Sequence, residues 1–229
     1  MKLAKLFLSI IVMFSLTGCL WWDTHTSGTR TPEALYMRGQ EAYKNRDYKD
    51  AVEIFQRVTE EYPLSECAIF AELGVADSYF SDKNYMVAEA AYNDFMEFHP
   101  TSSNLPYVMC QIGLCYYNRT LGIDRDQTET RMAEKSFEKL ISRFPSSKFS
   151  FLAEEKLREC RKKLGEHEFY VGQFYFNIGQ YRAALGRFEA IEEKYKHLGM
   201  DYKTASFIRE AEIRLAEEEK KKKIEDADQ

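Results

Sequence analysis

The side chains that most often perform catalysis or bind metals are scattered along this 229-residue sequence. The four histidines lie far apart and show no spacing typical of metal ligands: His25, His99, His167 and His197. The stretch most similar to a metal site is Asp124-x-Asp126-x-Thr128. A calcium loop beginning at Asp124 requires Gly and Glu where this chain has Glu129 and Lys135. Because the sequence also lacks phosphate-loop, nucleophile-elbow and zinc-protease motifs, we predict no catalytic residues, metal or cofactor.

One cysteine is placed for a different reaction, the attachment of lipid. Cys19 follows Leu16-Thr17-Gly18, at the end of a leader with basic residues near its start and an apolar stretch over residues 6–16. That stretch is too short to span a bilayer and fits a signal-peptide core. The ending resembles the bacterial lipobox, in which cleavage leaves a cysteine whose thiol carries diacylglycerol. We predict a lipoprotein signal peptide over residues 1–18 and a lipidated Cys19; an ordinary secretory leader is the alternative.

The residues after Cys19 predict where the lipid anchor leads. Leu20 follows the cysteine, and in enteric bacteria the absence of Asp at that position goes with sorting to the outer membrane. A triacylated cysteine anchors stably, where one acyl chain would be marginal. Residues 19–31 are read as a flexible tether, in which Trp21-Trp22 suits the membrane interface. We expect a lipid-anchored protein on the periplasmic face.

Composition limits the fold and the partners. With 32 basic and 37 acidic residues the formal net charge is −5, which disfavours nucleic acid as a partner. Aromatic residues make up 14% of the chain, so a folded core is expected, and five prolines are few for the turns of a β-sandwich. The remaining cysteines lack metal-ligand spacing and are interpreted as core residues, with a disulfide left open: Cys67, Cys110, Cys115 and Cys160.

A repeat of small and aromatic residues accounts for most of the sequence. Alanine precedes an aromatic residue by four positions in four segments: Ala51/Phe55, Ala88/Tyr92, Ala133/Phe137 and Ala184/Phe188. Small residues lie upstream of each pair, at Gly39, Ala76, Gly113 and Gly172, and proline ends the first three copies. This pattern resembles the tetratricopeptide repeat, a helix–turn–helix in which small residues let two helices approach and the ring fills the space between them. We predict an all-α, right-handed superhelix of about nine helices, with four repeats over residues 32–200.

Two spacings depart from the regular repeat. Pro63 to Ala76 and Pro100 to Gly113 both span 13 residues, whereas Pro145 to Gly172 spans 27. Apolar positions keep a helical spacing across that insertion, so one long helix over 149–178 is predicted, with a break at Gly165 as the alternative. Extra residues also fall near 121–130. A capping helix is predicted over 201–224, with Ala205, Ile208, Ala211 and Leu215 on one face, followed by a disordered tail over 225–229.

Several short segments, taken in order, resemble one family. They are Pro106-Tyr107-Val108-Met109, Gly113-Leu114, Gly122-Ile123-Asp124-Arg125, Leu164-Gly165-Glu166-His167-Glu168-Phe169 with Val171, and Ala183-Ala184-x-x-Arg187. With the lipobox and the repeats, they are similar to the BamD (ComL) family of outer-membrane assembly lipoproteins. The resemblance implies a non-enzymatic scaffold that docks on the POTRA domains of a BamA-type barrel and receives unfolded barrel substrates. A different repeat-bearing envelope lipoprotein, such as a secretin pilotin or a cell-division coordinator, is the alternative.

The resemblance also implies partner-binding residues. Accessory assembly lipoproteins are further expected partners, although the short repeat-three loop and the reduced fifth repeat depart from the family pattern. Arg187 matches a position where the family meets a POTRA acid; a local pair with Glu189, Glu192 or Glu193 is the alternative. First-helix positions of the first three repeats are predicted to line a substrate groove, unless their rings only pack against the next repeat: Tyr36, Gln40, Tyr43, Phe70, Asp77, Phe80, Tyr107 and Tyr117.

Overall fold

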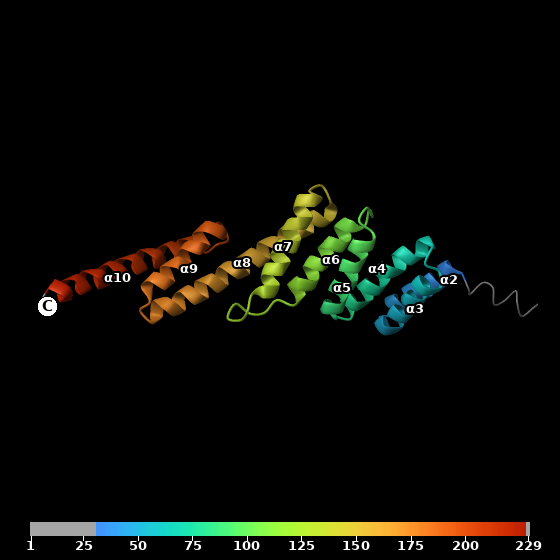
Figure 1. Ribbon diagram of the computed structural model, residues 1–229, viewed down its shortest axis with the longest axis horizontal. Coiled ribbons are helices and arrows are strands. Elements are labelled where there is room, and N and C mark those ends of the chain that lie inside the picture. Colours follow the sequence, from blue (N-terminus) through green and yellow to red (C-terminus); the bar gives the residue numbers. More distant parts are fainter. Residues whose placement is uncertain (1–30, 228–229) are drawn as a thin grey trace, which may run out of the picture. The chain divides into compact units, whose positions relative to one another are not determined.

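The structure is a computed structural model that describes residues 31–227. Within this range all nine regular elements are helices, from α2 (Pro32–Lys44) to α10 (Asp201–Ala227) (Figure 1). The predicted all-α class is therefore confirmed. None of the helices in the described range is long and apolar enough to cross a membrane. The predicted signal peptide, Cys19 and nearly all of the tether lie outside the described residues.

Consecutive helices pack against each other in pairs, as the predicted repeats require, and they are distributed over two compact units, residues 1–95 and 96–229. In the first unit α2 pairs with α3 (Tyr48–Glu61), and α4 (Glu66–Ser81) is followed by α5 (Tyr85–Phe98), whose last three residues are assigned to the second unit. In the second unit the order is α6 (Leu105–Asn118), α7 (Thr128–Arg143), α8 (Lys148–Asn177), α9 (Tyr181–Lys194) and α10. The helix order in Figure 1 follows the predicted repeats.

Short turns between paired helices use the same backbone device in three repeats. Arg46, Lys83 and Gly179 each adopt a positive φ, between 63° and 79°, directly after the first helix of a pair. A left-handed residue at this place lets the following backbone N–H groups bond the last free carbonyls of the helix. The next helix begins at a tyrosine in all three cases: Tyr48, Tyr85 and Tyr181. Repeat three has a longer connection and no such turn.

The glycine–aromatic contact predicted from the repeat is present in each unit. A Cβ added at Gly39 would lie 2.6 Å from the Phe55 ring, and one at Gly172 would lie 2.6 Å from the Phe188 ring. Gly113 is covered by the Phe137 ring in the same way. Paired helices can therefore approach closely only because these positions have no side chain. The three rings are almost completely buried.

Helix α8 runs through Gly165 without interruption, so the predicted long helix is confirmed and the proposed break is wrong. The glycine serves packing: a Cβ at Gly165 would meet Tyr195 Cβ at 3.2 Å and the tip of Met200 at 2.5 Å, both in the α9–α10 region. Close approach of that segment to α8 explains a residue that otherwise lowers helix propensity.

The last helix differs from its prediction in two respects. Ala205 is exposed, and the face packed on repeat four is formed by residues near Thr204, Phe207, Ile208 and Ala211. Phe207 anchors that face, because its ring lies 5.3–5.4 Å from the rings of Phe169, Phe176 and Phe188. In addition, α10 continues to Ala227 instead of ending at residue 224.

The four described cysteines are free thiols. Cys110, Cys115 and Cys160 are buried, which confirms their interpretation as core residues, whereas Cys67 is partly exposed. Burial raises the pKa of Cys110 to about 11 and that of Cys160 to about 12. Both thiols therefore stay protonated near neutral pH.

Candidate functional site

The predicted groove residues of the first unit lie on α2 and α4, the first helices of repeats one and two. The Tyr36 ring packs between Phe55, at 5.6 Å, and Phe70, at 6.4 Å between centroids. Gln40 Nε2 donates to the Tyr36 hydroxyl at 2.9 Å. The two helices thus bring Tyr36 and Phe70 together across the repeat boundary. Phe70 keeps 48% of its surface exposed, so an apolar side chain remains open to a partner.

The other three predicted residues in this unit are engaged by neighbouring side chains. The Tyr43 and Ser81 hydroxyls are 2.8 Å apart and link α2 to α4. Phe80 meets Tyr85 edge to face at 5.3 Å, and Asp77 accepts a hydrogen bond from the buried Tyr92 hydroxyl at 2.5 Å. Tyr36, Tyr43 and Phe80 therefore contact neighbouring side chains, as the packing alternative predicted.

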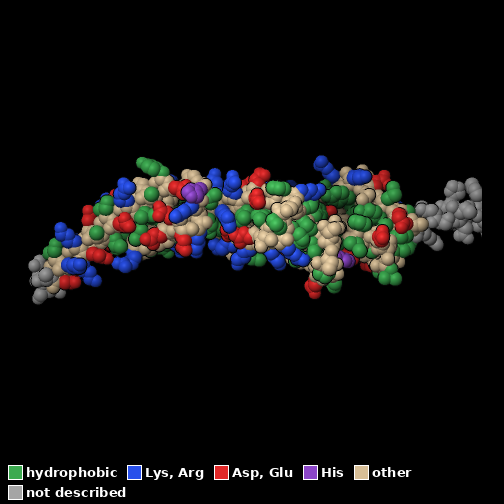
Figure 2. Space-filling model, turned by 90° about the horizontal axis from the view of Figure 1, so that it is seen from above, with side chains coloured by type: hydrophobic (Ala, Val, Ile, Leu, Met, Phe, Trp, Pro, Cys, Tyr) green, Lys and Arg blue, Asp and Glu red, His purple; other side chains and the backbone are tan. Residues whose placement is uncertain are grey.

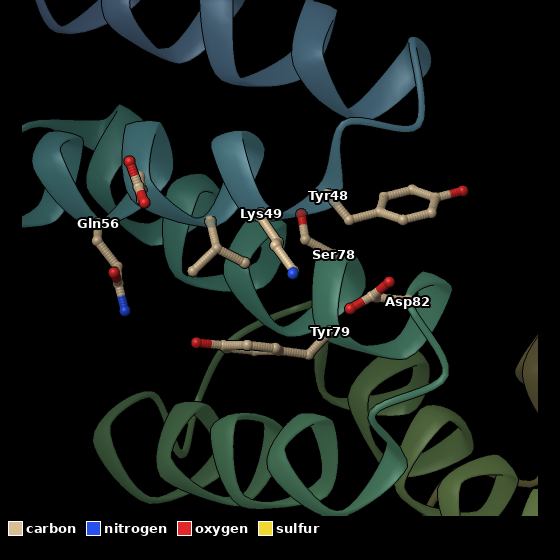
Figure 3. Close-up of a pocket in the computed structure, with 8 residues that line it drawn as sticks. Tyr48, Lys49, Gln56, Ser78, Tyr79 and Asp82 are labelled. Carbon is tan, nitrogen blue, oxygen red and sulfur yellow. The ribbon is translucent and has the colours of Figure 1, made fainter.

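A separate hollow of about 280 Å³ lies between α3 and α4, and sequence reasoning did not anticipate it. Figure 3 shows Tyr48, Lys49 and Gln56 of α3 facing Ser78, Tyr79 and Asp82 at the end of α4. None of the predicted groove residues lines it. Its polar residues carry no motif, because they come from two helices and are adjacent only after folding. In the sequence, the two aromatic residues Tyr48 and Tyr79 were the only indication of this hollow.

In the second unit the predicted residues Tyr107 and Tyr117 both project from α6 toward α8. Tyr107 meets Phe149 edge to face at 5.4 Å and accepts a hydrogen bond from Gln111 at 2.9 Å. Tyr117 donates a short hydrogen bond to the Glu159 carboxylate. This bond raises the pKa of Tyr117 and lowers the pKa of Glu159. Glu159 is therefore held as a carboxylate at neutral pH.

Lys156 completes this polar cluster on α8. Its ammonium lies 2.9 Å from Glu159 and 4.7 Å from the centre of the Tyr117 ring. A cation over a phenol face and beside a carboxylate is stabilised by both. The hydrogen bond that Lys156 donates to Glu159 raises the pKa of Lys156. The arrangement fixes Tyr117 firmly and leaves its polar groups satisfied.

Arg187 is exposed on α9, one residue before the buried Phe188, as its place in the repeat predicted. Its Nη1 lies 2.9 Å from Oε2 of Glu168 on α8. Arg187 therefore pairs with an acid on the neighbouring helix, and not with Glu189, Glu192 or Glu193 of its own helix. An arginine in this position can offer further N–H donors to a second carboxylate.

Charged side chains elsewhere form mixed surfaces. Figure 2 shows basic and acidic side chains intermingled along the end of the molecule that holds α10. Lys221 and Glu225 face each other at 3.9 Å, which agrees with a solvated helical end. No group of three metal-binding side chains occurs within residues 31–227.

Residues 29–226 match the family described as YfiO, outer membrane lipoprotein. The outer membrane protein assembly factor BamD of Rickettsia prowazekii is 30% identical over 151 residues, which cover 66% of this chain and 60% of that protein. The protein of the same name from Neisseria gonorrhoeae is 26% identical over 179 residues, which cover 72% of this chain and 67% of the relative. The chain thus spans about two thirds or less of these curated relatives.

Solved structures that are similar to this chain contain helical repeats. The TPR2AB-domain:pHSP90-complex of yeast Sti1 has 15% identity and a TM-score of 0.47, with 80% of this chain and 70% of that chain covered. A thermophilic TPR protein of Thermus thermophilus, TTC0263, has 15% identity and a TM-score of 0.43, with 78% and 99% covered.

Proposed function

We propose that this chain, which belongs to the YfiO family of outer membrane lipoproteins, is a non-enzymatic scaffold in the assembly of outer-membrane β-barrel proteins. The observation that carries the proposal is the family match over residues 29–226, together with relatives named outer membrane protein assembly factor. The fold supports it, because stacked helix pairs expose first-helix side chains in rows that suit protein partners.

The second unit is proposed to dock on the POTRA domains of a BamA-type barrel protein through a surface that includes Arg187. The support is local: the guanidinium is exposed, is placed by the buried neighbour Phe188, and is oriented by Glu168 at 2.9 Å. One carboxylate engages only Nη1, so Nε and Nη2 remain for an acid of the partner. Accessory assembly lipoproteins are further proposed partners.

The first-helix face is proposed to receive unfolded barrel substrates. In the first unit this face comprises Tyr36, Gln40, Tyr43, Phe70, Asp77 and Phe80, and in the second unit it comprises Tyr107 and Tyr117. Extended peptides with aromatic residues would stack on exposed rings such as Phe70. Tyr36 and Tyr43 would contribute the shape of the surface and no free hydrogen-bonding group, because their hydroxyls already bond neighbouring side chains.

Lipid on Cys19 is proposed to hold the chain at the periplasmic face of the outer membrane. Cys19 precedes the first described residue, Thr31, by twelve positions. An extended segment of that length reaches roughly 40 Å, which gives the helical repeats room to meet a partner beside the membrane.

Affinity purification from envelopes tests the assembly role. The lipidated protein should retain a BamA-type barrel protein, and recovery of a secretin or a division protein in its place would refute the proposal.

Photo-crosslinking probes at Tyr43 and Phe80 test the substrate surface with a barrel C-terminal peptide. A probe at Met86, which is 71% exposed on α5, serves as the second-helix control. Crosslinks at Met86 with none at Tyr43 or Phe80 would exclude this surface.

A further inference from the structure

The end of α8 carries three exposed apolar side chains on one face. Tyr170, Phe174 and Ile178 follow one another at intervals of four residues, and they keep 48%, 57% and 51% of their surface exposed. Single apolar side chains are ordinary on a protein surface, whereas a row of three on one helix forms a contiguous patch. We call these three residues the α8 stripe.

The same face of α8 is covered nearer the N-terminus of the helix. Phe137 of α7 belongs to one core cluster with Cys160 of α8. Further along, His167 Nδ1 lies 2.6 Å from the Ile123 carbonyl oxygen, so the α6–α7 connection, residues 119–127, covers that turn. In Figure 1 the end of α8 extends beyond α7 and this connection and runs alongside α9. The stripe begins three residues after His167, where the cover has ended.

In repeat two the equivalent face is covered by a helix. Counted from the small residue of each first helix, Tyr170 and Phe174 correspond to Gly74 and Ser78 of α4. A Cβ added at Gly74 would lie 2.7 Å from the ring of Phe55 on α3, and Ser78 is completely buried. In α8 the small residue lies 27 residues after the preceding proline instead of 13, which places the equivalent face beyond α7.

The composition of this part of α8 is that of a helix with neighbours on both sides. Residues 169–178 contain no charged side chain, although 30% of the chain is charged. Helix α6 is also uncharged, and there seven of fourteen residues are buried. Within residues 169–178 only Phe169 and Gly172 are buried. A charged ligand or an anionic surface would find no opposite charge here, so the surface suits an apolar protein face.

The α8 stripe is too small to hold two copies of this chain together. Half-exposed side chains of this size offer about 100 Å² each, so the stripe offers about 300 Å² per copy, whereas a stable interface takes about 800 Å² from each partner. The stripe is therefore suited to be one anchor within a larger contact with a different protein.

We propose that the α8 stripe docks an amphipathic α-helix of a partner protein, in the place that α3 takes on α4. Side chains four residues apart form the ridge that packs into the groove of a second helix. The stripe spans roughly 12 Å along the axis, which matches two to three turns of a helix with apolar residues three and four apart. Glu168, the partner of Arg187, lies six residues before Phe174 and about 120° around the helix. This anchor is therefore separate from Arg187, and it can fail while the assembly role holds.

Photo-crosslinking in cells tests the proposal on the full chain, with a p-benzoylphenylalanine probe at position 170, 174 or 178 in turn. Mass spectrometry identifies the residue to which each probe attaches. All three probes should attach to one segment of one partner, at residues three or four apart. A probe at Phe151, which is 66% exposed on the first half of α8, is the control and should not reach that segment. Attachment points two residues apart, attachment to lipid or to a second copy, or no attachment at all would overturn the proposal.

A charge placed in the stripe tests its contribution. Burial of one phenylalanine ring changes affinity more than tenfold, so Phe174→Arg should lower attachment of the probe at position 178 at least tenfold. The urea-unfolding midpoint should stay near that of the wild type, because Phe174 is exposed. Phe151→Arg is the matched control and should leave attachment unchanged. Equal attachment in the two variants would overturn the proposal, and where Phe174→Arg does not fold, the spacing of the attachment points decides.

Discussion

Arg187 on α9 donates through Nη1 to the carboxylate of Glu168 on α8 at 2.9 Å. The side chain of Glu168 is 18% exposed and that of Arg187 is 44% exposed. The carboxylate is therefore held by the surrounding protein, whereas the guanidinium is open to solvent and to a partner. A single-point contact restricts the guanidinium without using its other donors. The pair therefore favours a role for Glu168 in orienting Arg187 toward a second acid.

Charge reversal at Arg187 is predicted to weaken POTRA binding several-fold in a low-salt titration. An exposed ion pair alone is worth about 0–1 kcal/mol, and reversal adds repulsion from the partner acid. Glu168→Gln keeps an acceptor for Arg187 and should bind within about twofold of wild type, since its hydrogen bond persists. Glu168→Ala removes the acceptor and should bind more weakly.

Arg57 provides the matched control for that prediction. It is an exposed arginine on α3 that pairs with Glu61 at 2.9 Å, but it lies in repeat one. Arg57→Glu should leave POTRA binding unchanged. Equal losses in both reversals, or no loss in either, would place the interface elsewhere.

Tyr117→Phe is predicted to lower stability in a pH-dependent way. The Tyr117 hydrogen bond lowers the pKa of Glu159 below its ordinary value of 4.5, so its contribution is present above pH 4.5 and is lost as the pH falls through the lowered pKa. Glu159 is 40% exposed, so the loss at pH 7 should be only about 1 kcal/mol. Urea unfolding at pH 7 and pH 3 measures it, and a pH-independent difference would contradict the assignment.

Tyr36→Phe is the control for this pH dependence. Its hydroxyl bonds the neutral amide of Gln40, and burial raises the pKa of Tyr36 above 10.0. A raised tyrosine pKa affects stability only in strongly alkaline solution. Between pH 3 and pH 7 the effect of Tyr36→Phe should therefore stay constant.

Gly113→Ala is predicted to destabilise the second unit by about 1 kcal/mol. The new methyl group would overlap the completely buried ring of Phe137, and overpacking costs about 1–3 kcal/mol against a helix-propensity gain of about 1 kcal/mol. Gly186→Ala is the opposite case, because nothing lies within 4 Å of its added Cβ. That variant should gain up to about 1 kcal/mol. Shifts of the same sign in urea-unfolding midpoints would contradict this packing.

Thiol labelling is predicted to separate Cys67 from the other described cysteines. In the native protein at pH 8, N-ethylmaleimide should modify Cys67 first, because Cys110, Cys115 and Cys160 are buried. The raised pKa values, about 11 for Cys110 and about 12 for Cys160, also keep these thiols protonated. Mass spectrometry should show all four modified after denaturation. Rapid native labelling of Cys160 would show that the second unit opens.

Cys19→Ala is predicted to release the protein from the membrane. Lipid is the anchor expected from the Leu16-Thr17-Gly18-Cys19 sequence. Fractionation in cells depleted of the partner barrel measures the anchor alone. Sedimentation of the variant with the outer membrane as tightly as wild type would exclude a lipid anchor at this residue.

Local patterns made much of the fold predictable from the sequence. The Gly–Phe and Ala–Phe pairs form the contacts between paired helices, and their partners are close in sequence, so their spacing predicted the helix pairing. The 27 residues from Pro145 to Gly172, with apolar positions at helical spacing, predicted the length of α8. The end of α10 and its packed face were predicted less well. They depend on Phe207, whose three ring contacts come from α8 and α9 and leave no periodic trace of their own.

The sequence by itself determined the repeats, their register, the placement of Arg187 beside Phe188 and the expectation of a lipid anchor at Cys19. Tertiary structure alone decided which partners the polar residues have: Glu168 for Arg187, Glu159 for Tyr117 and Thr120 for Lys163. These pairs join residues 19, 42 and 43 positions apart. The physical reason is that helix periodicity fixes which face a side chain occupies, whereas its partner across the interface depends on how far one helix is shifted along another.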